Sequence, residues 1–161
     1  MPGPSKGSPL TDDYREMLSA LSAENVEYIV VGAYAVAFHG SPRATGDLDI
    51  LVSPTPENAQ RVYQGLLRFG APLSGVTIND FASPGLIFRI GRAPNCIDIT
   101  TDIDGVDFPT AWKNHVKIMI EDQAIPVLGI HELLASKIAA GRPKDLFDIA
   151  WIKQHLADEA T

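Results

Sequence analysis

The chain has 161 residues, of which 45% are apolar and 20% charged, so it is long enough for one domain with a core and too apolar for a disordered protein. Its formal net charge of −7 argues against a broad basic surface for duplex DNA or anionic membranes. The single cysteine, Cys96, excludes an internal disulfide and predicts a reducing, cytoplasmic location, and no apolar run approaches the roughly 20 residues of a membrane span.

The chain is expected to begin with a flexible arm over residues 1–10 and to continue as a single domain over 11–161. The arm, MPGPSKGSPL, is rich in Pro, Gly and Ser and lacks the apolar stretch of a signal peptide. Apolar periodicity and turn residues predict the elements that follow, in chain order: a helix over 11–24, a strand over 26–31, a helix over 33–38, a strand over 48–52, a helix over 56–68, a hairpin of 86–91 with 96–100, a hairpin of 116–120 with 124–127, and helices over 130–140 and 143–156. This order predicts an α/β (α+β) fold, a mixed sheet with helices packed on it.

Local capping signals mark several of these helix ends. Thr11 can cap the first helix through its hydroxyl, and Pro56 suits the first turn of the third. Gly141 suits the position just after a helix, and Pro143 suits the start of the next one. The break between the last two helices is therefore well marked.

Two aspartates, Asp47 and Asp49, stand at the start of the strand over 48–52. Because alternate residues of a strand share a face, both carboxylates should project together, while Leu48 and Ile50 face the core. Two like charges about 4 Å apart repel by roughly 4 kcal/mol at an effective dielectric constant near 20, so a proton, a cationic side chain or a divalent metal must relieve them. Carboxylate oxygens suit hard cations such as Mg²⁺, above all where phosphates supply further ligands.

A third carboxylate, Asp98, lies between two isoleucines of a later strand, where an unpartnered charge would be costly. It could join Asp47 and Asp49 in a site for one or two metal ions. It could instead pair with Arg89 or Arg92 across the hairpin, and an Asp-x-Asp pair is also common on a solvated strand end. The residues alone leave these alternatives open.

The segment upstream of the acidic pair, YIVVGAYAVAFHG, predicts a strand, a glycine turn and a helix of small residues. Gly32 permits the tight turn, and the N–H groups that begin with Ala33 could bind a phosphate. Arg43 and Thr45 lie in the loop before the acidic strand. Arg43 could bind phosphate through its planar guanidinium, or it could offset the charge of the aspartates. A metal-bound triphosphate would fit between these parts.

Together these motifs resemble the nucleotidyltransferase superfamily, which has the DNA polymerase β-like fold. That family shows a hydrophobic strand, Gly-Gly or Gly-Ser, a spacer, Asp-x-Asp or Asp-x-Glu, and a later strand aspartate. The counterparts here are Gly32-Ala33, thirteen residues, the acidic pair, and Asp98. Ala33 departs from the pattern, because it lacks the serine hydroxyl that would donate a hydrogen bond to a phosphate. More closely, VVGAYAVAFHGSPRATGDLDI and KIAAGRPKDLFDI resemble the small bacterial group that includes the AbiEii-type toxin nucleotidyltransferases, over roughly residues 26–152.

The resemblance implies an enzyme that moves NMP from an NTP such as ATP to a hydroxyl acceptor, with Mg²⁺ or Mn²⁺ as cofactor. The acceptor could be an RNA end, a protein or a small molecule. The resemblance assigns Asp47 and Asp49 to metal coordination. It assigns Asp98 to the catalytic metal and to accepting the proton of the attacking hydroxyl.

The resemblance also implies that Lys137 and Arg142 bind nucleotide phosphate and that Asp145 takes part in the site. Local chemistry offers alternatives, since Lys137 could extend along its helix into solvent and Asp145 could complement a helix dipole. A second hypothesis is a non-catalytic nucleotide-binding protein, or a partner protein of a toxin–antitoxin pair, on the same fold. The acidic charge balance argues against RNA binding without a local basic surface.

Overall fold

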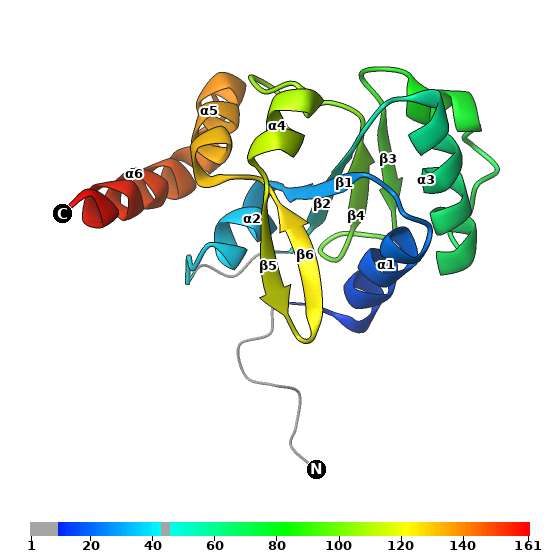
Figure 1. Cartoon of the computed structure of the whole chain (residues 1–161), viewed down its shortest axis with the longest axis horizontal. Helices are drawn as coiled ribbons and strands as arrows, with labels where there is room; N and C mark the ends of the chain where they lie inside the picture. The colour runs from blue at the N-terminus through cyan, green and yellow to red at the C-terminus, as the bar shows by residue number, and fades with distance from the viewer. Residues whose placement is uncertain (1–9, 43–45) are drawn as a thin grey trace, which may run out of the picture.

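The computed structural model describes residues 10–42 and 46–161 (Figure 1). Its elements, in chain order, are α1 (Asp12–Ala23), β1 (Tyr28–Val31), α2 (Gly32–Phe38), β2 (Leu48–Val52), α3 (Pro56–Phe69), the 3₁₀ helix η1 (Ile78–Ala82), β3 (Ile87–Ile90), β4 (Ile97–Thr100), α4 (Phe108–Asn114), β5 (Val116–Ile120), β6 (Gln123–Val127), α5 (Ile130–Ala140), the 3₁₀ turn η2 (Pro143–Asp145) and α6 (Leu146–Ala160). Of the residues expected in the N-terminal arm, the structure describes Leu10, which is buried.

The predicted elements are confirmed, with shifts at their ends. Thr11 accepts a hydrogen bond from the backbone N–H of Tyr14 and so caps α1, and Pro56 begins α3. Two short elements were not predicted, α4 and η1. The last helix also begins later than expected, because Pro143 starts a 3₁₀ turn and α6 follows only from Leu146.

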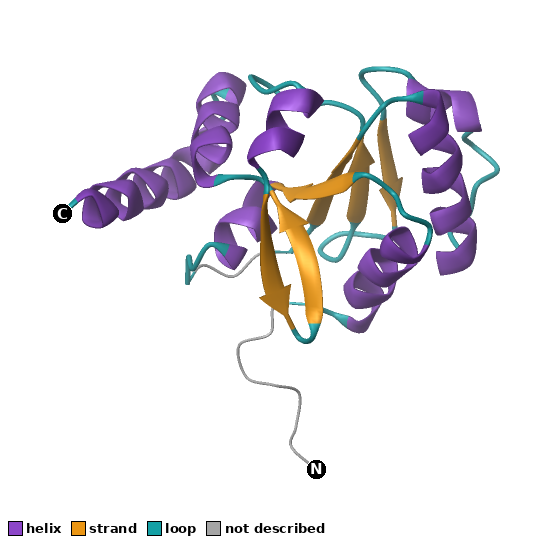
Figure 2. Ribbon diagram, viewed as in Figure 1, coloured by secondary structure: helices purple, strands orange, loops and turns teal. Residues whose placement is uncertain are grey.

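The six strands form one mixed sheet in the order β3-β4-β2-β1-β6-β5 (Figure 2). Both predicted hairpins are present, β3 with β4 and β5 with β6. The central pairs join strands that are distant in the sequence or separated by helices: β1 is antiparallel to β2, while β2 with β4 and β1 with β6 are parallel. The predicted fold class, a mixed sheet flanked by helices, is confirmed.

The core lies on both faces of the central strands. Every residue of β1 is buried, and in β2 all but Asp49 are buried. Helix α1 packs on α3 and α2 packs on α5, and in Figure 1 these two pairs lie on opposite sides of the sheet. Helix α6 extends away from the sheet to the C-terminus. No helix within the described ranges is long and apolar enough to cross a membrane.

Candidate active site

Three aspartates meet because of the way in which β1, β2 and β4 pair. β2 and β4 are parallel with Asp49 opposite Asp98, and β1 is antiparallel to β2 with Val31 opposite Asp49. Asp47 precedes β2, and its Oδ1 accepts a hydrogen bond from the backbone N–H of Cys96 at 3.1 Å. The three carboxylates predicted from the sequence therefore line the same cavity.

Gly32 stands next to this cluster at the end of β1. Its φ angle of +70° lies in the left-handed region that favours glycine. A Cβ atom at this position would overlap Oδ2 of Asp49. The glycine thus permits the predicted tight turn and also leaves room for the carboxylate of Asp49. Ala33, the next residue, lines the same cavity.

Asp98 pairs with Arg89, which is one of the two hairpin partners that the sequence left open. Nε and Nη2 of Arg89 donate to Oδ1 and Oδ2 of Asp98, both at 2.9 Å, and Nη2 lies 3.7 Å from Oδ2 of Asp47. The hairpin register places Arg89 opposite Asp98, whereas Arg92 lies in the turn between the strands. One guanidinium therefore balances part of the charge of two carboxylates.

The third carboxylate, Asp49, is harder to ionise than an ordinary aspartate. Burial, which is the largest cause, and the negative charges of Asp98 and Asp47 together raise the pKa of Asp49 from its ordinary value of 3.8 to about 6. Lys144 acts in the opposite direction and lowers this pKa. The cluster therefore carries uncompensated negative charge at neutral pH, which a cation bound in the cavity would relieve.

The raised pKa of Asp49 predicts that the free energy of unfolding falls as the pH rises through about 6. A carboxyl group with a higher pKa in the folded protein contributes stability below its unfolded pKa, and this contribution is lost as the pH rises through about 6. With EDTA present, the free energy of unfolding of Asp49→Asn relative to the wild type should rise by about 1 kcal/mol between about pH 5 and pH 7.5. Urea unfolding at several pH values tests this. Parallel pH profiles of the two proteins would contradict it.

The carboxylate cluster opens onto a cavity of about 490 Å³, a size typical of small-molecule sites. The same cavity is also lined by the basic residues Lys137, Arg142 and Lys144, which come from the end of α5 and from the turn that follows it. A cavity lined by both carboxylates and cationic side chains suits a ligand that combines phosphate groups with a bound cation.

Lys137 is buried between two aspartates. Its Nζ lies 3.1 Å from Oδ1 of Asp145 and 3.2 Å from Oδ2 of Asp148, and all three residues are at most 5% exposed. Nε of Arg142 donates to the other oxygen of Asp145 at 2.7 Å. Burial would raise the pKa of Asp145, but the hydrogen bonds from Arg142 and Lys137 outweigh it and lower this pKa. Lys137 also lines the cavity, and the direct phosphate contact that the resemblance implies for it stays a prediction.

Lys144 is a candidate that the sequence analysis missed. It lines the cavity on the side where its charge reaches Asp49, and it makes no ion pair within the ranges 10–42 and 46–161. Arg142, two residues earlier, also lines the cavity but is paired with Asp145. The signal was present in the sequence as the basic pair of RPK, but only the fold shows that the lysine faces the aspartates.

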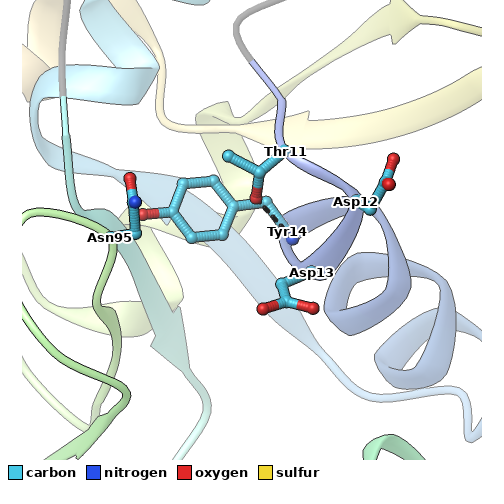
Figure 3. A pocket seen from close by; sticks show the side chains of 5 residues that line it. All are labelled: Thr11, Asp12, Asp13, Tyr14 and Asn95. Carbon is cyan, nitrogen blue, oxygen red and sulfur yellow. Dashed lines mark hydrogen bonds between the residues drawn. The ribbon is translucent and has the colours of Figure 1, made fainter.

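Tyr14 anchors Gly46, which leads into β2. Its hydroxyl donates to the carbonyl oxygens of Gly46 and Cys96, at 2.5 and 3.1 Å, which share its single proton. Burial raises the pKa of this hydroxyl, so it remains a donor. In Figure 3 the ring extends from α1 toward Asn95, across a separate cavity of about 260 Å³. Because Cys96 also binds Asp47, this contact ties α1 to the acidic cluster.

The donor set suits a hard cation, since three aspartates supply oxygen ligands at one place. As they stand, however, no three His, Cys, Asp or Glu side chains in the described part of the chain are grouped closely enough to hold a metal ion. The guanidinium of Arg89 occupies both oxygens of Asp98 and lies 3.7 Å from Oδ2 of Asp47. The predicted metal site thus has suitable ligand atoms, but these atoms are not grouped around one position.

The predicted phosphate ligands Arg43 and Thr45 lie outside the described residues.

Two solved structures share this fold. One is TM1012 from Thermotoga maritima, described as a nucleotidyltransferase, with 18% sequence identity, a TM-score of 0.55, and coverage of 87% of this chain and 90% of that chain. The other is the lincosamide antibiotic adenylyltransferase LnuA in its lincomycin-bound form, with 17% identity, a TM-score of 0.58, and coverage of 89% of this chain and 97% of that chain. Among curated proteins, no match to this sequence was found. At these identities the two structures establish the fold and nothing finer.

The sequence itself matches the profile of a family over residues 16–161, which includes the acidic pair, Asp98 and the segment from Lys137 to Asp148. That family is described as nucleotidyl transferase AbiEii toxin, type IV toxin–antitoxin system. The resemblance inferred from two short segments is therefore confirmed over most of the chain. The chain belongs to the AbiEii nucleotidyl transferase toxin family.

Proposed function

We propose that this protein transfers a nucleoside monophosphate from an NTP such as ATP to a hydroxyl group of an acceptor, in a reaction that depends on Mg²⁺ or Mn²⁺. The observation that carries this proposal is the meeting of three carboxylates, Asp47, Asp49 and Asp98, with basic side chains in one cavity of a chain of this family. Carboxylates for a cation and basic groups for phosphates are the parts that nucleotidyl transfer requires.

The acidic side of the cavity is assigned to the reacting end of the nucleotide. Asp47, Asp49 and Asp98 would hold the divalent cation, which when bound neutralises charge on the α-phosphate and on the pyrophosphate leaving group. Asp98 lies on β4 beside Asp49, where it can accept the proton of the acceptor hydroxyl as that oxygen attacks the α-phosphorus. The products are the nucleotidylated acceptor and pyrophosphate.

The basic side of the cavity is assigned to the phosphates. Lys144 and Arg142 both line the cavity and can donate hydrogen bonds to phosphate oxygens. Gly32, beside Asp49, and Ala33 offer backbone groups to the same cavity. Arg43 and Thr45 stay candidate phosphate ligands from the loop before β2. Lys137 and Asp145 support this side from within, because their buried ion pair fixes the turn that carries the two basic residues.

The acceptor is an RNA end, a protein or a small molecule. A type IV toxin family suggests a macromolecule and a partner protein, whereas LnuA is a lincosamide adenylyltransferase that was solved with lincomycin bound. The net charge of −7 weighs against RNA binding by this chain unaided. All three acceptor classes therefore belong in the test.

The test is label transfer from each α-³²P-labelled NTP with Mg²⁺ or Mn²⁺ and, in separate reactions, total RNA, protein extract or lincomycin. Transfer by the wild type that is lost in Asp47→Asn supports the proposal and names the acceptor class. Tight nucleotide binding without transfer in any reaction supports instead a non-catalytic nucleotide-binding protein on the same fold.

Gly32→Ala should impair transfer more than it impairs folding. The substitution strains the backbone at a φ of +70° and pushes the carboxylate of Asp49 out of place. We expect a loss of about 1 kcal/mol in the free energy of unfolding and at least about a tenfold loss of transfer. Gly70→Ala is the matched control, because Gly70 has a φ of +92° and a Cβ atom added there would meet no other atom within 4 Å. Equal transfer by the two variants would refute the steric argument.

Lys144→Gln should weaken nucleotide binding. Loss of one charge-assisted hydrogen bond to phosphate costs about 1.5 kcal/mol, so KM for the NTP should rise about tenfold. Lys153→Gln removes the same charge from an exposed position on α6 and should leave KM within about twofold. Steady-state kinetics with varied NTP measures both. A KM for Lys144→Gln close to that of the control would remove Lys144 from the site.

A further inference from the structure

Arg89 pairs with Asp98, the carboxylate to which the proposed reaction assigns both a metal ion and the proton of the acceptor. Its guanidinium makes two parallel hydrogen bonds to Asp98, at 2.9 Å each, and extends to within 3.7 Å of Oδ2 of Asp47. The Asp98 side chain is 9% exposed, whereas the Arg89 side chain is 55% exposed. The guanidinium is therefore the solvent-exposed member of this pair, and Asp98 is its buried member.

We propose that Arg89 is an internal counter-ion of the acidic cluster, which a divalent cation displaces from Asp98 when it binds. This inference rests on the proposed function, since it concerns the same cation site. It explains why three aspartates with suitable oxygens line one cavity and yet are not arranged around a single point. Two of them, Asp98 and Asp47, lie against a planar guanidinium instead.

The two cations compete because they use the same atoms. Both oxygens of Asp98 already accept from Arg89, and a metal ion needs at least one of them at about 2.1 Å, with no N–H donor between. The metal ion should win this competition, because the electrostatic attraction of clustered carboxylates is stronger for a divalent ion than for a monovalent guanidinium. The positive charge of the metal then repels Arg89.

The fold allows Arg89 to leave without disturbing the core. β3 is an edge strand of the sheet, and the residues of this strand next to the cavity, Ile87 and Arg89, are exposed. The side chain can rotate into solvent while the backbone pairing of β3 with β4 stays intact. Asp98 stays in place as well, because its own strand is paired on both sides, with β2 and with β3.

The test is a titration of the nucleotide-free protein with Mn²⁺ at constant ionic strength. The electron paramagnetic resonance signal of free Mn²⁺ gives the dissociation constant of each variant. Arg89→Gln should bind Mn²⁺ about fivefold more tightly than the wild type, because the competitor is gone. Arg89→Lys keeps the charge but loses the paired hydrogen bonds, so its dissociation constant should fall between the two. Arg92→Gln is the matched control, since it removes an equal charge from the turn of the same hairpin, and it should change the constant by less than about twofold.

Thermal unfolding supplies a second measurement that needs no catalytic activity. In EDTA, Arg89→Gln should melt below the wild type, because Asp98 loses its partner, and saturating Mn²⁺ should raise its melting temperature by more than that of the wild type. Equal or weaker Mn²⁺ binding by Arg89→Gln, or equal tightening by Arg92→Gln, overturns the displacement and leaves the proposed function standing. Absence of Mn²⁺ binding by every variant, even with an NTP analogue present, overturns both.

Discussion

Asp98→Asn should reduce nucleotidyl transfer by about a thousandfold while the protein stays folded. Asparagine has the shape of aspartate but neither its charge nor its capacity to accept a proton, so both the cation site and the proposed base are lost. A thousandfold loss corresponds to about 4 kcal/mol of transition-state stabilisation. Initial rates of label transfer at saturating NTP measure it, with thermal unfolding as the check on folding.

Asp102→Asn is the control for this substitution. Asp102 lines the same cavity two residues after the end of β4, and its Oδ2 accepts a hydrogen bond from the backbone N–H of Gly85 at 2.9 Å, which an asparagine oxygen can also accept. We expect transfer within about threefold of the wild type, because this carboxylate is exposed and lies outside the cluster of three. Similar losses in both variants would show that overall negative charge in the cavity, and not the position of Asp98, supports the reaction.

Lys137→Met should lower the free energy of unfolding by about 3–5 kcal/mol. Methionine fills the volume of the lysine stem, but it leaves the buried carboxylates of Asp145 and Asp148 without the ammonium between them. Removing one partner of a buried ionic cluster is costly because the remaining charges cannot regain their hydration. Urea unfolding at neutral pH measures the loss, and Lys153→Met, at an exposed position of α6, should change stability by less than about 0.5 kcal/mol.

A triple variant separates the buried charge from the packing. Lys137→Met combined with Asp145→Asn and Asp148→Asn removes all three charges at nearly constant volume, so it should recover more than half of the stability that the single substitution loses. Arg142 loses one partner in this variant, but its side chain is 51% exposed and can be solvated. If the triple variant is no more stable than Lys137→Met, the loss comes from the packing of the lysine stem.

The candidate site shows which side-chain positions can be predicted from the spacing of residues along the chain. Asp47 and Asp49 could be paired on one face from their spacing alone, because a strand alternates with a period of two. The choice between Arg89 and Arg92 as the partner of Asp98 needed the hairpin register, which a turn of several residues leaves open. The partners of Lys137 could not be predicted from such spacing. Helical spacing placed it beside an apolar face, but its two aspartates lie eight and eleven residues later, beyond a turn whose direction the sequence does not show.

By itself, the sequence determined the features whose causes lie within a few residues: the helix ends at Thr11, Pro56 and Gly141, the two hairpins, and the acidic pair at the start of β2. Capping, turn chemistry and strand alternation all act over such distances. Only the tertiary structure decided that β4 lies parallel to β2, so that Asp98 meets Asp49, and that Lys144 lines the same cavity as these aspartates. The physical reason is that pairing between distant strands depends on which apolar faces are buried together, and that balance belongs to the whole chain.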